Sequence, residues 1–140
     1  MLTGGLHHLS IRTTDLGRAK RFYIGTMGFH AIRETDGVVL LNAHGTLLGL
    51  LGAAPETSPG DRFDPFRVGL DHLALAVDNA DSLCELKQQL DAAGVRNNGV
   101  EDDTLTGARY IAFYDPDGIA WELYSMPASA AKTNTTGGVA

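Results

Sequence analysis

The chain has 140 residues, of which 44% are hydrophobic, and its formal net charge is -6 at pH 7. This length provides one domain with a substantial core. The acidic net charge disfavours a nucleic-acid partner, because phosphate contacts need a basic face. No apolar stretch is long enough to cross a membrane. The single cysteine, Cys84, excludes an internal disulfide and is expected to be a small buried residue of a helix.

The first half of the sequence predicts a strand, a helix and three further strands. Residues 6–12 alternate in polarity as a half-buried strand does. Apolar residues at helical spacing then run from Leu16 to Met27, with Thr14-Asp15 as a cap before them and Gly28 as a stop after them. Short apolar runs separated by turn residues predict the remaining strands over residues 31–34, 37–41 and 46–51.

The second half repeats this order. Residues 70–76 match residues 6–12, with a histidine at the third place of each, and a second amphipathic segment runs from Leu83 to Ala93 before Gly94. Each half therefore reads as a βαβββ module of about sixty to seventy residues. Strands are expected over residues 109–114 and 119–125, a loop over 97–108, and equivalent hairpin turns over 42–45 and 115–118.

These elements predict an α+β fold in which two βαβββ modules form a curved mixed sheet around a concave metal-binding cavity. A single domain is expected over residues 1–125, with module one at 5–52, a linker at 53–67 and module two at 68–125. The tail over residues 126–140 is rich in Ala, Thr and Gly and is expected to be disordered. No secretory leader precedes the first strand, so a cytoplasmic location is expected.

The alternation of side chains along a strand decides where the two repeated histidines point. His8 shares a face with Ser10 and Arg12, and His72 shares a face with Ala74. The apolar residues between them must pack under the amphipathic helices. Both histidines are therefore expected on the opposite, concave face.

The last strand adds a carboxylate to the same face, because Glu122 and Tyr124 alternate with apolar neighbours. An ionised carboxylate buried alone would cost several kcal/mol, so a cation is expected beside it. A lone strand histidine is more often a core or surface residue. Three such residues on one face, His8, His72 and Glu122, instead predict a facial triad that leaves coordination positions open.

With this strand order and these three residues, the sequence resembles the vicinal oxygen chelate superfamily. That superfamily includes glyoxalase I, bleomycin-resistance proteins, extradiol dioxygenases and fosfomycin-inactivating thiol transferases. The resemblance covers residues 4–125 and lies in HLSIRTTDL, RFY, MGF, GLDHLALAV and FYDPDGIAWEL. It implies that His8, His72 and Glu122 are the metal ligands, and that Gly49 stands at a fourth corner without a ligating side chain. Modules of this superfamily pair within one chain or across a dimer, so a homodimer is expected and the chain that supplies each histidine stays open.

Departures from individual subfamilies narrow the activity that the resemblance implies. Extradiol dioxygenases usually have a cavity histidine where residues 102–106 have none, and a tyrosine where Ala112 stands. Fosfomycin enzymes use a threonine at the place of Ser10, but the segment 97–108 offers acids where a phosphonate needs a lysine. Gly49 argues against glyoxalase I, which has four protein ligands, and bleomycin-binding members usually lack the triad.

The cavity wall is predicted to be apolar and aromatic, which suits a phenolic or polycyclic substrate. Counting back from the turn at residues 115–118 points Tyr110, Ala112 and Tyr114 inward, and the same count in the first half points Val39 and Leu41 inward. Phe63 and Phe66 in the linker are expected to cap the cavity or to pack on a second subunit. The predicted substrate-binding residues are Val39, Leu41, Ala74, Ala112, Tyr114, Tyr124, Phe63 and Phe66.

The predicted catalytic residues are Tyr110, Arg12 and Ser10. Tyr110 is expected to move a proton in place of the missing histidine and tyrosine. Arg12 is expected to hold a carboxylate or enolate of the substrate, although a salt bridge at the sheet edge is an equal alternative.

We therefore expect a divalent-metal-dependent enzyme, an oxygenase that acts on a small aromatic substrate chelated through two neighbouring oxygens. Fe(II) is favoured, and Mn, Ni or Zn would point to isomerase or transferase chemistry. A glyoxalase-type isomerase, a lyase or a thiol transferase is the alternative among enzymes. A protein that binds an aromatic antibiotic without turnover is the alternative from another class. The expected partner is a small molecule, with no nucleic acid and no membrane.

Overall fold

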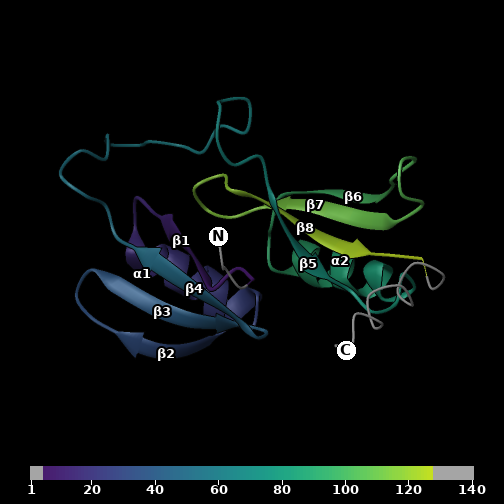
Figure 1. Cartoon of the computed structure of the whole chain (residues 1–140), viewed down its shortest axis with the longest axis horizontal. Coiled ribbons are helices and arrows are strands. Elements are labelled where there is room, and N and C mark those ends of the chain that lie inside the picture. Colours follow the sequence, from purple (N-terminus) through teal and green to yellow (C-terminus); the bar gives the residue numbers. More distant parts are fainter. Residues whose placement is uncertain (1–4, 128–140) are drawn as a thin grey trace, which may run out of the picture. The chain divides into compact units, whose positions relative to one another are not determined.

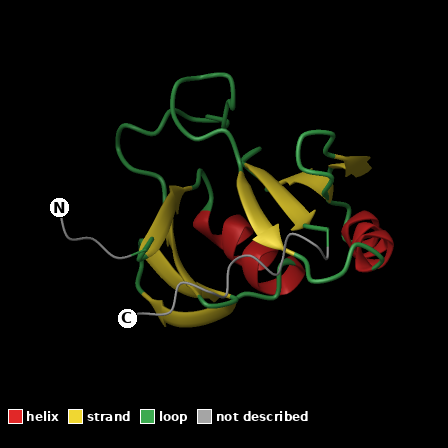
Figure 2. Ribbon diagram, turned by 45° about the vertical axis from the view of Figure 1, so that its right-hand side comes forward, coloured by secondary structure: helices red, strands yellow, loops and turns green. Residues whose placement is uncertain are grey.

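The computed structural model describes residues 5–127, and the contacts within it divide the chain into two compact units. In the described part, unit 1 comprises residues 5–63 and 115–118, and unit 2 comprises residues 64–114 and 119–127. Each unit holds a four-stranded mixed sheet with its helix on one face (Figure 1, Figure 2). The predicted α+β fold of two modules is confirmed. The single domain over residues 1–125 stays a prediction, and residues 128–140 of the predicted tail lie outside the described residues.

Unit 1 follows the predicted order of a strand, a helix and three strands. The cap and the stop of its helical segment are as expected: Asp15 Oδ1 accepts a hydrogen bond from the Arg18 N–H at 2.9 Å, and Gly28 has φ +69°. The sheet order is β1-β4-β3-β2, with β1 parallel to β4. The elements are β1 (His8–Arg12), α1 (Leu16–Lys20), the π-helix η1 (Arg21–Thr26), β2 (His30–Glu34), β3 (Val38–Ala43) and β4 (Thr46–Leu51).

Unit 2 repeats this arrangement with the sheet order β5-β8-β7-β6, in which β5 is parallel to β8. Its helix packs against β6 and β7 and buries Leu83 and Leu90. Among residues 5–127, no helix has the length and apolar character needed to span a membrane. The elements are β5 (Leu73–Ala76), α2 (Ser82–Ala92), β6 (Asn97–Asp102), β7 (Arg109–Tyr114) and β8 (Ala120–Ser125).

Strand β6 corrects the expectation of a loop over residues 97–108. The segment Asn97–Asp102 has too few apolar residues to be recognised by pattern, but its backbone pairs antiparallel with β7. As the outermost strand of its sheet it can remain polar. Gly99 has φ +82° and lies where the register shifts between Asn97 and Val100, which is the geometry of a bulge.

The two β-hairpins differ in length, and this difference corrects the predicted cavity wall of unit 1. Ala43 pairs with Thr46 across a two-residue turn, whereas Tyr114 pairs with Ala120 across the five residues 115–119. A count of alternating side chains therefore cannot be carried from one hairpin to the other. Val39 and Leu41, predicted to line the cavity, are 0% exposed and lie on the core side of the sheet with their strand partners Leu50 and Leu48.

Cys84 is exposed, which corrects the expectation of a buried helix residue. It follows Leu83, whose side chain is fully buried. A step of one residue turns a helix by about 100°, so the neighbour of an inward residue points outward.

The loop Asp115–Gly118 connects two strands of unit 2 but belongs to unit 1. Asp117 is 4% exposed and accepts hydrogen bonds from the hydroxyls of Thr13 and Thr14, and it forms an ion pair with Arg18 at 2.6 Å. Asp115 accepts a hydrogen bond from the Tyr23 hydroxyl at 2.8 Å. These bonds place two carboxylates of the second half of the sequence in the core of the first unit.

We expect Asp117→Asn to lower the free energy of unfolding by roughly 2–4 kcal/mol, because the change leaves buried donors without their charged acceptor. Burial raises the pKa of Asp117, but the bonds from Thr13 and Thr14 and the charge of Arg18 together bring it below the usual value. The stabilisation is therefore complete above the unfolded-state pKa of about 4 and is lost as pH falls through the lower pKa of the folded protein. Urea unfolding at pH 7 and pH 3 measures both effects.

Asp36→Asn is the matched control, because Asp36 is exposed. The role given to Asp117 would be wrong if both variants unfolded within about 0.5 kcal/mol of the wild type at pH 7.

Candidate functional site

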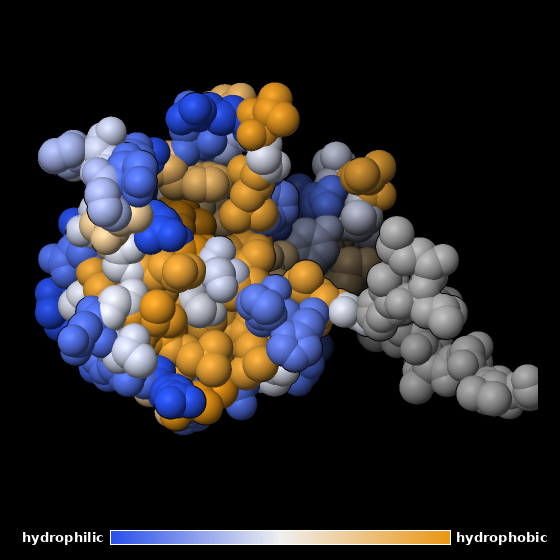
Figure 3. All heavy atoms as spheres, turned by 60° about the vertical axis from the view of Figure 1, so that its left-hand side comes forward, coloured by the Kyte–Doolittle hydropathy of each residue, from blue (hydrophilic) through white to orange (hydrophobic). Residues whose placement is uncertain are grey.

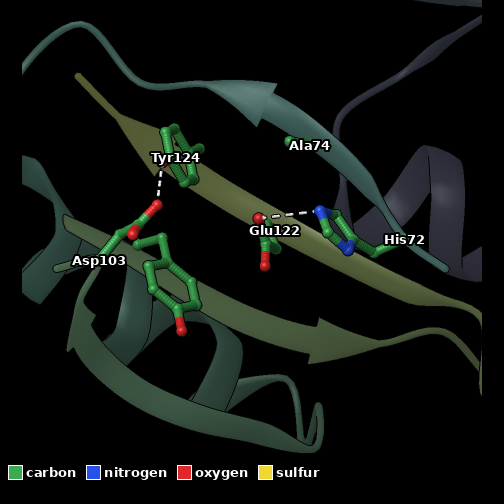
Figure 4. A pocket seen from close by; sticks show the side chains of 6 residues that line it. His72, Ala74, Asp103, Glu122 and Tyr124 are labelled. Atoms are coloured by element: carbon green, nitrogen blue, oxygen red, sulfur yellow. Dashed lines mark hydrogen bonds and ion pairs between the residues drawn. The ribbon is translucent and has the colours of Figure 1, made fainter. Parts of the chain in front are cut away.

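Two of the predicted metal ligands, His72 and Glu122, lie together in unit 2. His72 directly precedes β5, and Glu122 lies on β8 opposite Ala74 of β5. His72 Nε2 is 3.4 Å from Glu122 Oε2 (Figure 4). His72 Nδ1 is 2.6 Å from Asp71 Oδ1. The imidazole is thus held between two carboxylates.

This arrangement fits a divalent cation. A metal-binding histidine typically donates its other ring N–H to a carboxylate, which fixes the tautomer and the ring, and Asp71 is placed to do so for His72. Burial raises the pKa of Glu122, the charge of His72 lowers it, and the carboxylates of Asp103, Asp71 and Glu101 raise it further. A cation beside Glu122 would relieve that cost. The residues present suit a metal with nitrogen and oxygen ligands.

The third predicted ligand, His8, belongs to unit 1. It is exposed on β1, and its Nδ1 lies 2.9 Å from His7 Nδ1. Between residues 5 and 127, no three His, Cys, Asp or Glu side chains gather into a metal-binding group. The structure therefore brings His72 and Glu122 together, and the participation of His8 remains a prediction.

A cavity of about 460 Å³ adjoins the His72–Glu122 pair and lies entirely in unit 2. The strand register puts Ala112 opposite Glu122 and Tyr110 opposite Tyr124, on the face away from the buried Ile111 and Phe113. The predicted alternation is thus correct in this sheet. The six lining residues are His72, Ala74, Asp103, Tyr110, Glu122 and Tyr124.

The two tyrosines form the aromatic part of this wall. Their rings are stacked with centroids 5.9 Å apart and planes 27° apart. A hydrogen bond to Glu101, followed by burial, raises the pKa of Tyr110. The bond to Asp103 likewise raises the pKa of Tyr124. Both phenols therefore keep their protons at neutral pH.

Sequence reasoning missed the acidic partners of this wall. The Tyr124 hydroxyl donates to Asp103 Oδ2 at 2.5 Å, and Thr106 Oγ1 lies 2.7 Å from the same hydroxyl. Asp71 could have been suspected because it directly precedes His72. Asp103 and Glu101 could not, because they lie in the segment that was expected to be a loop.

Tyr114, a predicted substrate-binding residue, is on the same face but does not line the cavity. The guanidinium of Arg96 lies over its ring, 3.8 Å from the centroid. This cation–π contact covers one face of the ring.

Ser10 and Arg12 share the face of His8 in unit 1, as predicted, because they pair with Gly49 and Leu51 while Ile11 is buried. Arg12 Nη1 donates to the Gly52 carbonyl at 2.7 Å, so it binds backbone beyond the end of β4 and not a carboxylate. A Cβ at position 49 would lie 2.7 Å from Ser10 Oγ. The serine hydroxyl thus occupies the space that a side chain at position 49 would need.

The surface of unit 1 has an apolar area, and Figure 3 shows hydrophobic side chains gathered there within a hydrophilic border. Val38 on β3 of this unit is 40% exposed. Phe63 is half-buried, and its N–H donates to the Asp117 carbonyl at 3.0 Å in unit 1. Phe66 is 96% exposed in unit 2. Their predicted role as a cap or as a subunit contact stays a prediction.

Comparison with known proteins agrees with this architecture. The family described as Glyoxalase/Bleomycin resistance protein/Dioxygenase superfamily matches residues 5–123. The uncharacterized protein YwkD of Bacillus subtilis is 32% identical over 132 residues, which cover 90% of this chain and all of that protein.

Two solved structures share the fold. A glyoxalase family protein from Enterococcus faecalis is 26% identical with a TM-score of 0.74, covering 89% of this chain and 99% of that one. The fosfomycin resistance protein FosX from Listeria monocytogenes is 18% identical with a TM-score of 0.72, covering 91% and 98%. The match over residues 5–123 includes strands of both modules and the residues His8, His72 and Glu122, so the chain belongs to the Glyoxalase/Bleomycin resistance protein/Dioxygenase superfamily.

Proposed function

We propose that this protein is a divalent-metal-dependent oxygenase that acts on a small aromatic substrate bound through two neighbouring oxygens. The observation that carries the proposal is the His72–Glu122 pair, oriented by Asp71 and adjoining a cavity with two stacked tyrosines. His8 is proposed as the third protein ligand, which leaves open positions for substrate oxygens. Fe(II) is the proposed metal, since it suits oxygen chemistry in a site of two histidines and one carboxylate.

The shape and charge of the cavity favour an aromatic substrate over an anionic one. Ala74 and Ala112 flank Glu122 in the sheet and leave room for a flat ring beside it. No lysine or arginine is among the lining residues, although Asp103 and Glu122 are. A phosphonate or the carboxylates of glutathione would meet negative charge here. These features weigh against the fosfomycin-type and glyoxalase-type alternatives.

A bound divalent ion would hold the two substrate oxygens and favour their ionised form. The proton that leaves a substrate hydroxyl needs an acceptor, and Tyr110 with Glu101 provides one. The Tyr110 oxygen can accept the substrate proton while its own proton moves to the Glu101 carboxylate, because the two residues are strand partners and Glu101 is the first cause of the raised Tyr110 pKa. Tyr110 thus passes on a proton without becoming a free phenolate.

The metal assignment is tested by His72→Ala, which we expect to lose stoichiometric metal. Asp71→Asn should weaken metal affinity by roughly 10–100-fold, because the ring loses the charge of its orienting acceptor. Metal content after anaerobic purification and competition with a chelator measure both effects. His30→Ala and Asp78→Asn are controls, since both residues are exposed and neither belongs to the proposed site. Full metal content in the His72 variant would refute the assignment.

The oxygenase activity is tested by oxygen uptake with catechol and the Fe(II)-loaded protein. Tyr110→Phe should lower turnover by about 100-fold, the lower range of what a positioned acid–base group contributes, with metal content unchanged. Tyr114→Phe is the matched control, because Arg96 covers that ring. Equal turnover in both variants would make Tyr110 structural. Tight binding of aromatic compounds without turnover, unaffected by a chelator, would instead favour the antibiotic-binding alternative.

A further inference from the structure

We propose that Asp103 makes the cavity of unit 2 selective for aromatic ligands that carry a protonated amine at the end remote from their chelating oxygens. This inference rests on the proposed function, because it takes the His72–Glu122 pair as the place where the oxygens bind. It goes beyond that function by assigning a specificity residue and the charge of the substrate.

The carboxylate of Asp103 is fixed in one orientation at the turn after β6. Its Oδ2 accepts from the Tyr124 hydroxyl at 2.5 Å and from Thr106 Oγ1 at 2.9 Å. Its Oδ1 accepts from the Leu105 N–H at 2.8 Å. Asp103 also lines the cavity, so a group inside the cavity meets a charge that has already lost its rotational freedom.

Asp103 retains room for one more donor. An ionised carboxylate has about four acceptor positions, and three are taken by Tyr124, Thr106 and Leu105. These three donors and the Thr106 backbone N–H lower the pKa of Asp103, which keeps it charged at neutral pH. Oδ2 accepts two of the three bonds and Oδ1 accepts one, so a further donor would approach Oδ1.

The charge of Asp103 is not offset by the other lining groups. Neither lysine nor arginine lines the cavity. The two charges of a divalent ion at His72 would be matched by Glu122 and Asp71, the two carboxylates beside that ring, and not by Asp103. Glu101, which pairs with Tyr110 across β6 and β7, adds a second carboxylate beside this wall. A protonated amine is attracted by this arrangement, and a carboxylate of the ligand is repelled.

The spacing suits a molecule with one ring. Glu122 and Tyr124 lie on the same strand face two residues apart, which is about 7 Å along a strand. Figure 4 shows Glu122 between His72 on one side and the Tyr124–Asp103 pair on the other. Oxygens near Glu122 and an amine near Asp103 therefore match the two ends of a catechol with a short side chain.

The test compares two ligands of similar size that differ in charge, 4-(2-aminoethyl)catechol and 3-(3,4-dihydroxyphenyl)propanoate, with unsubstituted catechol as the neutral reference. Binding is measured by calorimetry under anaerobic conditions on the full chain loaded with Zn(II), which is redox-inert. The amine should bind at least about tenfold tighter than the carboxylate at low salt, and the ratio should fall as ionic strength rises. In Asp103→Asn, which keeps the oxygen that accepts from Leu105, the ratio should drop to about threefold or less.

Asp102→Asn is the matched control, because Asp102 is adjacent, 80% exposed and paired with Arg109 at 3.2 Å; the preference should survive there. Binding of catechol with no charge preference, or a preference that Asp103→Asn leaves unchanged, would overturn the inference while sparing the proposed function. Failure of all three compounds to bind the Zn(II)-loaded protein would overturn both. If the Asp103 variant does not fold, the wild type still provides a test. An amine-to-carboxylate affinity ratio that does not change with ionic strength would overturn the inference.

Discussion

The site depends on one constraint, which is that each four-stranded sheet can bury only one of its faces under a helix. In unit 2, Ile111, Phe113, Trp121 and Leu123 occupy that face and are at most 8% exposed. Strict alternation along the strands then assigns the intervening residues to the other face. Glu122 is polar and only partly exposed because it shares a strand with Trp121 and Leu123. The packing of the core therefore decides which side chains face the cavity.

The alternation along the strands also decides which charged and aromatic residues lie on the open face of the sheet. Glu122, Tyr110 and Tyr124 come from the two central strands β7 and β8, while Asp103 and Glu101 come from the polar outer strand β6 and the turn that follows it. Apolar strands supply the ring surfaces and the buried carboxylate, and the polar strand supplies fixed acceptors for the phenols. The result is a cavity that holds two protonated tyrosines among carboxylates.

Most of the fold could be predicted from the sequence because the apolar pattern is strong where the core is. Strands β4 and β7 have the predicted bounds, and the repeat of residues 6–12 at 70–76 correctly indicated two modules. The errors lie where pattern carries little information. Strand β6 is polar, and the inward face of β3 was misassigned because the turn lengths of the two hairpins differ. The role of Asp103 could not be predicted, because an aspartate in a turn is usually solvated and the sequence does not show that Tyr124 donates to it.

Because the loop Asp115–Gly118 belongs to unit 1, the two units do not coincide with the two halves of the sequence. The first half of the sequence keeps its short turn, His44-Gly45, within its own unit, whereas the second half gives its longer turn to the other unit. The chain therefore passes from one unit to the other at residue 64, at residue 115 and again at residue 119. No single cut in the backbone can therefore separate the two units, and a fragment that ends before residue 115 lacks the carboxylates that Thr13, Thr14 and Tyr23 bind.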